Sequence, residues 1–393
     1  MPKLTIARLE LGGKRVFLRA DLNAPLEGGA VSDDTRLAAV VPTIEHARAA
    51  GASVVLASHL GRPKGKPTAE FSLKPVAERL AVLLRREVPL APDCVGPAVE
   101  AQARALKPGD LLLLENLRFH KEEEANDDGF ARGLAALAEV YVNDAFAAAH
   151  RAHASIDAIT KHLRPAAAGL LMDRELTALG RVLEAPARPL LAILGGAKVS
   201  DKLTLVENLL SRVQGLAIGG GMAFTFLKAQ GLEVGRSLVE PDHLETARRV
   251  LDTAKRREVE ILLPVDAVVA PGLDSPAGQT VPVGSIPVDQ LGLDVGPKTV
   301  ERFAGAIRAA KTIVWNGPMG VFERAPFAQG TMAVAHAVAG SSAFSVVGGG
   351  DSVASVNAAG VADRIGYIST AGGAFLEFLE GRSLPGVEAL TDA

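Results

Sequence analysis

The sequence contains little cysteine, few aromatic residues and no long apolar run. Its single cysteine, Cys94, excludes an intramolecular disulfide and is typical of a chain that folds in a reducing compartment. Aromatic residues make up 4% of the chain, too few for the stacking platforms that bind single-stranded nucleic acid. No apolar run approaches the ~20 residues of a membrane span, and the first residues lack the apolar core of a signal peptide. We therefore expect a cytoplasmic protein without a membrane partner.

An excess of charge of one sign is also lacking. The formal net charge is −3, which gives no reason to expect nucleic acid or an anionic membrane surface as a partner. The densest acidic segment, residues 122–128, is interpreted as a solvated loop without a function. The neighbours of Cys94 offer no catalytic partner, so we interpret this residue as a structural thiol rather than a nucleophile.

The length and the apolar pattern predict an α/β protein with two domains. At 393 residues the chain is too long for one core. Short, continuous apolar runs are typical of strands buried on both faces of a parallel sheet, and the segments between them show helical spacing. Their alternation predicts mainly parallel sheets flanked by helices. The predicted strands are residues 16–18, 53–57, 111–114, 140–142, 190–194, 215–218, 261–263, 312–315 and 344–347; predicted helices include 73–84, 203–213 and 243–255.

A helix followed by prolines separates the two halves. Residues 170–183 have the pattern of one helix, and Pro186 and Pro189 follow it, where proline stops a helix. This segment is interpreted either as a hinge or as a passive connector. We predict an N-terminal domain over residues 1–168, an interdomain helix and hinge over 169–188, and a C-terminal domain over 189–375.

Basic side chains follow the predicted strands of the first half. Ligands of open α/β sheets bind outside the carboxyl ends of the strands, and the planar guanidinium of arginine suits phosphate and carboxylate oxygens. The pattern therefore predicts a site for a small and highly anionic molecule. The residues concerned are His59, Arg62, Arg118 and Arg151, with Asp21, Asn23 and Arg36 after the first strand.

Glycine-rich turns follow the predicted strands of the second half. Glycine lets backbone N–H groups approach a ligand, and helix N-termini attract anions, so a set of such turns at one sheet edge suits a nucleotide. Each turn alone fits a tight α/β connection equally well. The turns lie at residues 195–196, 219–221, 317–320, 348–350 and 372–373.

Three charged residues in this half each have two interpretations. Lys198 and Lys202 lie near the start of a helix, where the helix dipole disfavours a cation. Either a bound phosphate or pairing with Asp201 or another carboxylate would offset that cost. Asp351 suits the N-cap of a helix over residues 352–359, and it equally suits a ligand of Mg²⁺, which prefers one or two carboxylates plus phosphate oxygens.

Several common nucleotide signatures are absent. The chain has neither a Gly-x4-Gly-Lys-[Ser/Thr] sequence nor a protein-kinase glycine loop followed by His-Arg-Asp. A nicotinamide-dependent dehydrogenase, a competing hypothesis for an α/β chain, would carry Gly-x-Gly-x-x-Gly after the first strand of a domain. Residues 195–198 do not fit that pattern. A phosphoryl-transfer enzyme with this sequence would belong to neither of the first two classes.

Taken together, these motifs closely resemble the phosphoglycerate kinase family. The resemblance implies two Rossmann-like, three-layer αβα domains joined by a hinge helix, with the tail 376–393 packing on the N-terminal domain. It also implies reversible phosphoryl transfer between 1,3-bisphosphoglycerate and ADP, giving 3-phosphoglycerate and ATP, by direct in-line transfer after hinge closure. The matching segments follow the family order and span nearly the whole chain: 19–25, 58–63, 115–120, 143–155, 195–202, 219–227, 315–323, 348–352 and 384–390.

The same resemblance implies a role for each candidate residue, with Mg²⁺ as cofactor, ADP or ATP as co-substrate, and a monomer as the expected state. Phosphoglycerate would be bound by Asp21, Asn23, Arg36, His59, Arg62, Arg118 and Arg151. The nucleotide would be bound by Lys202, Gly219, Gly220, Gly292, Pro318, Glu323, Gly350, Asp351, Ser352 and Val353, with Asp351 holding Mg²⁺. The transferring group would be stabilised by the catalytic residues Arg36, Lys198, Gly372 and Gly373.

Three positions depart from the family pattern. Residues 147–149 are Ala-Ala-Ala where Gly-Thr-Ala is usual, Arg236 replaces a common lysine, and Ala371 replaces the first of three glycines. An alanine at position 371 is strained by about 1 kcal/mol or more if its φ is positive. Because no charged catalytic group is lost, we expect an active enzyme. The alternative is a catalytically silent relative that still binds phosphate ligands, and turnover distinguishes the two.

Overall fold

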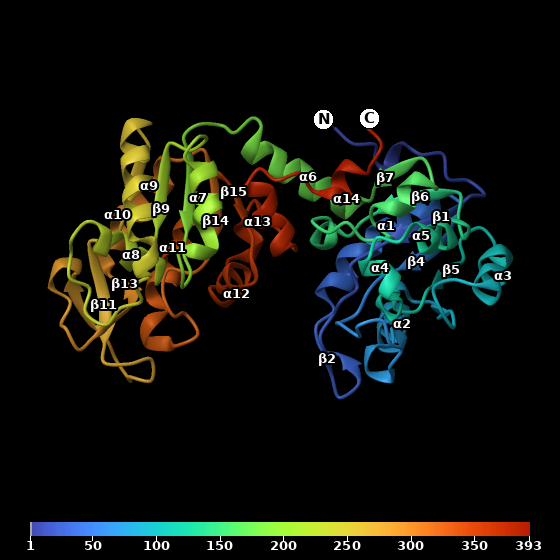
Figure 1. The fold of residues 1–393 in the computed structure, drawn as a ribbon, viewed down its shortest axis with the longest axis horizontal. Coiled ribbons are helices and arrows are strands. Elements are labelled where there is room, and N and C mark those ends of the chain that lie inside the picture. Colours follow the sequence, from blue (N-terminus) through green and yellow to red (C-terminus); the bar gives the residue numbers. More distant parts are fainter. Residues whose placement is uncertain (1) are drawn as a thin grey trace. The chain divides into compact units, whose positions relative to one another are not determined.

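The chain folds into two units, each built on a parallel sheet (Figure 1). The structure is a computed structural model that describes residues 2–393. Unit 1 contains the residues up to Thr177 together with Ser383–Ala393, and unit 2 is Ala178–Arg382. The α/β fold class predicted from the alternation of apolar runs is confirmed. No helix within residues 2–393 is long and apolar enough to cross a membrane.

Unit 1 contains a five-stranded parallel sheet with the order β5-β4-β1-β6-β7. Four of its strands lie where the apolar runs predicted them, to within two residues. The fifth, β7, was missed because three alanines carry little strand signal. The strands are β1 (Arg15–Arg19), β4 (Ser53–Ala57), β5 (Leu111–Leu113), β6 (Val140–Asn143) and β7 (Ala166–Ala168).

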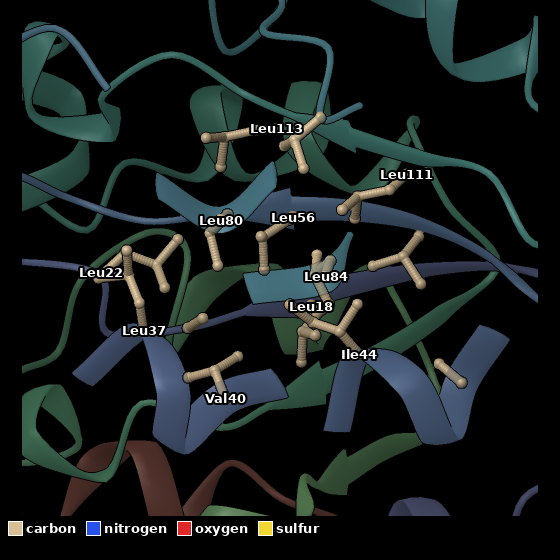
Figure 2. Packing of buried hydrophobic residues seen from close by; sticks show 14 of the residues in the cluster. Leu18, Leu22, Leu37, Val40, Ile44, Leu56, Leu80, Leu84, Leu111 and Leu113 are labelled. Carbon is tan, nitrogen blue, oxygen red and sulfur yellow. The ribbon is translucent and has the colours of Figure 1, made fainter. Parts of the chain in front are cut away.

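Aliphatic side chains fill the space between this sheet and the helices α1 (Thr35–Ala49) and α2 (Lys74–Leu84). Figure 2 shows Leu18 of β1 and Leu56 of β4 close to Val40 and Ile44 of α1. All four side chains are completely buried. Successive side chains of a strand point to opposite faces, so the burial of all five residues of β4 means that both faces of the sheet are covered.

The last residues of the chain complete unit 1. Helix α14 (Pro385–Glu388) begins after the chain has left unit 2, and Gly386 donates its N–H to Ala149 O at 2.8 Å. Thr391 donates to Ala166 O of β7 at 2.9 Å and accepts from Leu4 N at 2.8 Å. The tail that packs on unit 1 is Ser383–Ala393, whereas residues 376–382 of the predicted tail belong to unit 2.

Unit 2 contains a six-stranded parallel sheet and a smaller antiparallel one. The parallel sheet has the order β10-β9-β8-β14-β15-β16. The antiparallel sheet, β12-β11-β13, was not predicted: β12 is largely exposed and ends in a proline, β13 contains a glycine, and the short apolar run of β11 was overlooked. The strands are β8 (Leu190–Leu194), β9 (Gly215–Ile218), β10 (Glu260–Leu262), β11 (Asp266–Ala270), β12 (Gln279–Pro282), β13 (Leu291–Val295), β14 (Thr312–Asn316), β15 (Phe344–Val347) and β16 (Tyr367–Ile368).

The remaining elements connect these strands. Unit 1 also contains the two-residue strands β2 (Leu26–Glu27) and β3 (Ala30–Val31), and the helices α3 (Pro97–Ala105), α4 (Lys121–Glu124) and α5 (Asp128–Ala135). Unit 2 contains α7 (Leu203–Leu209), α8 (Met222–Ala229), α9 (Leu244–Arg256), α10 (Pro297–Ala309), α11 (Gln329–Ala339), α12 (Gly350–Ala358) and α13 (Gly373–Leu379). Short 3₁₀ turns include η3 (Leu117–Phe119), η4 (Phe146–Ala148) and η6 (Ser200–Lys202).

The helix predicted between the domains is α6 (Leu170–Leu183), with the predicted bounds. Its first turn is anchored in unit 1, because Asp144 Oδ1 accepts hydrogen bonds from Leu171 N at 2.9 Å and from Met172 N at 3.0 Å. Burial raises the pKa of Asp144 to about 6, against the lowering effect of these hydrogen bonds. The two units divide within α6, after Thr177, which lies inside the predicted interdomain segment 169–188.

The prediction of a solvated acidic loop at residues 122–128 was wrong. This segment forms α4 and the start of α5, with Asp127 capping α5 by accepting a hydrogen bond from Phe130 N at 2.8 Å. Glu123 in its middle is completely buried. The error arose because a run of charged residues indicates solvent exposure only where no buried partner is present, and such a partner is invisible in the local sequence.

Shortening Leu390 to alanine tests how much the C-terminal tail stabilises unit 1. Leu390 is 3% exposed, so Leu390→Ala should lower the stability of unit 1 by about 2–4 kcal/mol through lost burial and the cavity left behind. Hydrogen exchange followed by mass spectrometry should show faster exchange in β7. The control Val82→Ala, at a side chain that is 62% exposed, should leave exchange unchanged. Equal exchange in both variants would contradict the proposed contribution.

Candidate functional site

The candidate anion site lies at the carboxyl edge of the unit 1 sheet. Strands β5, β4, β1 and β6 are neighbours and run parallel, so the segments that follow them meet at one edge. Those four segments, with α1 contributing Arg36, carry every residue that the sequence predicted for the anionic ligand: Asp21, Asn23, Arg36, His59, Arg62, Arg118 and Arg151.

The segment after β1 is linked to α1 and to the segment after β4. Asp21 forms an ion pair with Arg36, the second residue of α1. Asn23 Oδ1 accepts a hydrogen bond from Gly61 N at 2.9 Å. Gly61 has a φ of 58°, and a Cβ there would lie 2.4 Å from the Phe71 ring, so no other residue fits this turn without rearrangement. These contacts position Arg36 and Asn23 on one side of the site.

Arg118 is positioned by a buried asparagine that sequence reasoning did not select. Asn116 is completely buried; its Oδ1 accepts from Arg118 N at 3.0 Å and its Nδ2 donates to Leu60 O at 2.8 Å. The Arg118 guanidinium donates to Gly61 O at 2.7 Å and lies 3.3 Å from the Glu124 carboxylate. Burial lowers the pKa of Arg118, and Glu124 opposes this effect. An asparagine three residues after β5, at the N-cap of η3, was the available signal for this capping role.

His59 marks where the cationic side chains converge. It is 6% exposed, and its pKa lies well below the usual value because of burial first and of the charges on Arg19, Arg118 and Arg151 next. A neutral imidazole is therefore in contact with the Arg19 guanidinium and under the electrostatic influence of those of Arg118 and Arg151. Arg151 is half-buried and donates to His150 Nε2 at 3.1 Å, and Arg62 is exposed.

The sequence analysis also missed Arg19, the last residue of β1. Its side chain is 1% exposed and its guanidinium reaches His59 Nδ1 at 3.2 Å. A basic residue at the end of a buried strand was the signal that pointed to it, since a charged group is rarely buried without a partner. Unit 1 thus concentrates more positive charge at this edge than the sequence analysis assigned.

The candidate nucleotide site lies at the carboxyl edge of the unit 2 parallel sheet. The glycine turns that follow β8, β9, β14 and β15 are held together by backbone hydrogen bonds, such as Gly196 N to Pro318 O at 3.0 Å and Gly220 N to Met319 O at 2.9 Å. A Cβ on Gly220, whose φ is 67°, would lie 2.6 Å from Gly196. The close approach of these turns explains the glycine at position 220 without a ligand.

The remaining glycines of the candidate site fall into two groups. A Cβ on Gly219 would meet Met319 Sδ at 2.5 Å, and one on Gly292 would lie 2.0 Å from the Phe224 ring, so both are required by packing. A Cβ on Gly350 or Gly372 would meet nothing within 4 Å. The open space beside those two backbones is where a ligand has room to approach.

Lys202 is surrounded by oxygens of the same turns and not by a carboxylate partner. Its Nζ donates to Gly195 O at 2.7 Å, to Asn316 O at 3.0 Å and to Asn316 Oδ1 at 2.5 Å. Burial lowers the pKa of Lys202 to about 8, and the charges of Asp351 and Asp201 oppose that effect. The pairing with Asp201 that the sequence left open is not formed, and the ammonium is held by carbonyl groups beside β8 and β14.

Asp351 lies in the first turn of α12, and its side chain is exposed. The N-cap interpretation was wrong: α12 begins two residues earlier than predicted, at Gly350, and the residue at the N-cap is Gly349, with a φ of 93°. Ser352 Oγ accepts from Gly317 N at 2.6 Å, and Val353 N donates to Gly349 O at 3.0 Å. An exposed carboxylate close enough to influence the charged Lys202 fits Mg²⁺, which takes one or two carboxylates and completes its shell with phosphate oxygens.

The other predicted residues of unit 2 lie on neighbouring loops. Val321 N donates to Leu293 O at 2.9 Å, which joins the loop carrying Pro318 and Glu323 to β13, which carries Gly292. Pro318 is buried, and Glu323 is exposed. Lys198 lies on the exposed surface of the turn after β8, and Gly372 and Gly373 lie at the start of α13.

Two departures from the family pattern fit the backbone. Ala371 is buried, and it is not one of the non-glycine residues with positive φ among residues 2–393, so alanine causes no strain there. Ala148 and Ala149 are buried in and beside η4, and Ala149 packs against Gly386 of the tail.

Cys94 belongs to a separate cluster in unit 1. Among residues 2–393, Asp93, Cys94 and His120 are the group whose ligand atoms lie within 4.8 Å of one another. His120 Nε2 is 2.6 Å from Asp93 Oδ1, and the Cys94 thiol donates to Glu115 O at 2.9 Å. Burial raises the pKa of Cys94 well above its usual value, which disfavours the thiolate. This environment fits the interpretation of Cys94 as a structural thiol.

The pKa of Lys202 predicts how nucleotide affinity depends on pH. Because that pKa is about 8 without a ligand, and a bound phosphate raises it, the charge that binds phosphate is lost as the pH rises above 8. The Kd for ADP should therefore rise between pH 8 and 9.5, by at most about tenfold per pH unit. Isothermal titration calorimetry measures this, and Lys202→Met should bind weakly with a flat pH profile over that range. The same rise in the variant would assign the dependence to another group.

The whole chain is similar to known phosphoglycerate kinases. The family model described as phosphoglycerate kinase matches residues 6–382. Phosphoglycerate kinases of Moorella thermoacetica and Koribacter versatilis are 58% identical over 393 residues and 57% identical over 402 residues, each covering 100% of both chains. The structure of phosphoglycerate kinase from Coxiella burnetii matches with a TM-score of 0.93 and 44% identity, over 99% of this chain and 98% of that chain. The structure from Pyrococcus horikoshii OT3 matches with a TM-score of 0.81 and 35% identity, over 98% of each chain.

Proposed function

This chain belongs to the phosphoglycerate kinase family, and we propose that it transfers a phosphoryl group between 1,3-bisphosphoglycerate and ADP, giving 3-phosphoglycerate and ATP. The reaction is reversible and serves glycolysis and gluconeogenesis. The observation that supports this proposal best is the convergence of guanidinium groups around His59 at one sheet edge of unit 1. Placing like charges together out of water destabilises the folded protein unless an anion binds between them. Phosphoglycerate supplies two anionic groups, a phosphate and a carboxylate. Membership of the family sets the dehydrogenase hypothesis aside.

The phosphoglycerate is assigned to unit 1. Arg62, Arg118 and Arg151 supply positive charge and fixed forks of N–H donors for the phosphate. Asp21 and Asn23 are held in place by Arg36 and Gly61 and present oxygen and amide groups to the hydroxyl-bearing part of the molecule. His59 is neutral and contributes a hydrogen bond without adding charge.

The nucleotide is assigned to unit 2. Lys202 and the backbone N–H groups of Gly350 and Ser352 at the start of α12 are suited to its phosphates, and Val353 follows them in the same turn. Gly219, Gly220, Gly292 and Pro318 line the base side, and Glu323 accepts hydrogen bonds from the ribose. Mg²⁺ would be held by Asp351 together with phosphate oxygens, and when bound it would neutralise part of the phosphate charge.

Direct in-line transfer needs positioning and countercharge rather than a general base. The acceptor oxygen belongs to a carboxylate or to a nucleotide phosphate and is already ionised, so no proton has to be removed. In a loose transition state, negative charge spreads over the equatorial oxygens of the transferring group. Arg36, Lys198 and the backbone N–H groups at Gly372 and Gly373 are proposed to stabilise that charge.

Transfer also requires the two ligands to meet. The two substrates are assigned to different units, so we infer that α6 acts as part of a hinge and that closure brings the ligands into line. Closure would also exclude water, which hydrolyses an acyl phosphate. We further propose that the protein works in the cytoplasm as a monomer, without a nucleic acid or membrane partner.

Replacing the two proposed transfer residues tests this mechanism. In an assay with 3-phosphoglycerate and Mg-ATP, coupled to NADH oxidation through glyceraldehyde-3-phosphate dehydrogenase, the wild type should turn over. Arg36→Ala and Lys198→Ala should each lower kcat by about 100- to 1,000-fold, the effect of removing one donor to developing charge. Lys228→Ala, at a surface lysine paired with Glu233, should retain wild-type kcat.

The silent-relative hypothesis makes the opposite prediction. If the wild type binds 3-phosphoglycerate in calorimetry but does not turn it over, the enzyme assignment fails and the chain is a phosphate-ligand binding protein. If the wild type turns over and both alanine variants keep its kcat, the reaction stands but the roles of Arg36 and Lys198 are wrong. Each result leads to a different conclusion, so the assay and the binding measurement are interpreted together.

A further inference from the structure

Arg19 is a buried cation in contact with uncharged groups. Its Nε donates to Ser155 Oγ at 2.9 Å, one terminal nitrogen donates to Ala20 O, and the other lies 3.2 Å from His59 Nδ1. Among residues 2–393, no carboxylate forms an ion pair with this guanidinium. A charge taken out of water needs a countercharge close by, so a buried carboxylate near Arg19 is to be expected.

Glu123 supplies that countercharge through one serine hydroxyl. The Ser155 hydroxyl accepts from Arg19 and donates to Glu123 Oε1 at 2.6 Å, while Ser155 N donates to Glu123 Oε2 at 2.9 Å. Arg19, Ser155 and Glu123 are all at most 1% exposed. Burial raises the pKa of Glu123, and Arg19 is the strongest influence in the opposite direction. The three side chains form a chain of hydrogen bonds whose two ends carry opposite charges.

Arg19, at one end of these hydrogen bonds, determines which nitrogen of His59 carries a hydrogen. A guanidinium group has only donors, so His59 Nδ1, which faces Arg19, must accept. The neutral ring therefore carries its hydrogen on Nε2. That N–H is the group His59 has available to donate to an anionic ligand at the carboxyl edge.

Glu123 also joins the two segments that carry the arginines. It belongs to α4, which begins three residues after Arg118, and its backbone oxygen accepts from Ala154 N at 2.9 Å in the segment that follows Arg151. His153 Nδ1 lies 3.8 Å from Glu123 Oε1, but burial and the nearby Arg19, Arg118 and Arg151 lower the pKa of His153 to about 3. His153 therefore remains neutral, and the carboxylate faces arginine charges only.

We propose that Glu123 is a positioning residue for the anion site of unit 1: acting through Ser155 and Arg19, it holds His59 as an Nε2–H donor and keeps the segments of Arg118 and Arg151 in register. This inference rests on the assignment of phosphoglycerate to unit 1. Glu123 does not itself touch the ligand. Its negative charge is required because the arginines assigned to the ligand are mutually repulsive cations.

Kinetics of Glu123→Gln test the proposal. Glutamine keeps the size of the side chain but removes the charge, and its NH2 group, which only donates, replaces one of the two oxygens that accept from Ser155. The KM for 3-phosphoglycerate should rise about 10- to 100-fold. This is the usual effect of losing a residue that orients the binding residues without touching the ligand itself. The KM for ATP should stay within about twofold. Glu122→Gln, the neighbouring carboxylate in α4, is the matched control and should match the wild type in both constants.

The protonation pattern of His59 provides a second measurement. It would stay the same in Glu123→Gln if Glu123 had only a structural role. In ¹⁵N spectra the wild-type His59 should show a hydrogen on Nε2 and an unprotonated Nδ1, assigned by comparison with His59→Gln. In Glu123→Gln the ring should populate both tautomers, because Arg19 is no longer held against Nδ1. A folded Glu123→Gln with the wild-type His59 spectrum and the wild-type KM for 3-phosphoglycerate would overturn the proposal.

A second variant keeps the test decisive if Glu123→Gln does not fold. Ser155→Ala removes the bridging hydroxyl but leaves the carboxylate paired with the backbone N–H at position 155, and it should change the His59 spectrum and the KM in the same direction. An unchanged His59 spectrum and an unchanged KM in Ser155→Ala would equally contradict the proposed role of Glu123. The His59 spectrum can be recorded without turnover. Failure of the proposed role of Glu123 is therefore distinguishable from failure of the proposed function, which would appear as an inactive wild type.

Discussion

Repulsion between cations at the carboxyl edge of the unit 1 sheet is the constraint on which the rest of that unit depends. The parallel register of β1 with β4 and β6 brings their carboxyl ends together, so the arginines that follow them are forced close to one another. A small set of carboxylates reduces this repulsion between the arginines. Asp21 pairs with Arg36, Glu124 lies beside Arg118, and the buried Glu123 faces Arg19 through Ser155. These carboxylates compensate Arg36, Arg118 and Arg19 in part, and positive charge remains in excess at the edge, available to an anionic ligand.

Unit 2 reaches a similar end by a different route. Its sheet edge is made of backbone turns rather than of long charged side chains, and the glycines allow those turns to approach one another closely. The one strongly buried cation there, Lys202, is held by carbonyl oxygens, which orient the ammonium but do not neutralise it. A ligand phosphate would complete the charge balance of that site. Asp351, exposed at the start of α12, is the carboxylate proposed to share a metal ion with the phosphates.

The division of labour between the units follows from the chemistry proposed for them. Phosphoryl transfer between two anions needs each anion bound and oriented before they meet, because bringing two unbound anions together is opposed by their mutual repulsion. Unit 1 holds one set of countercharges and unit 2 another, and α6 connects them with its first turn anchored by Asp144. A positioning residue such as Glu123 fits this scheme, since the proposed role is to maintain an arrangement that cation repulsion would otherwise disperse.

The sequence by itself determined most strands of the two parallel sheets, the fold class and the family. Strands β4, β8, β9 and β15 lie within the predicted bounds because continuous apolar runs between polar turns have few other ways to be buried. Motif order over the whole chain was enough to identify the family. Only the tertiary structure decided the partners of buried charges: Glu123 is one of several acidic residues in a local run, and nothing in that run distinguishes it from Glu122. Its partner Ser155 lies 32 residues later in the sequence. Arg19, which donates to Ser155, lies 136 residues before Ser155. The electrostatics of a buried group depend on which neighbours folding brings to it, and that information is not local in the sequence.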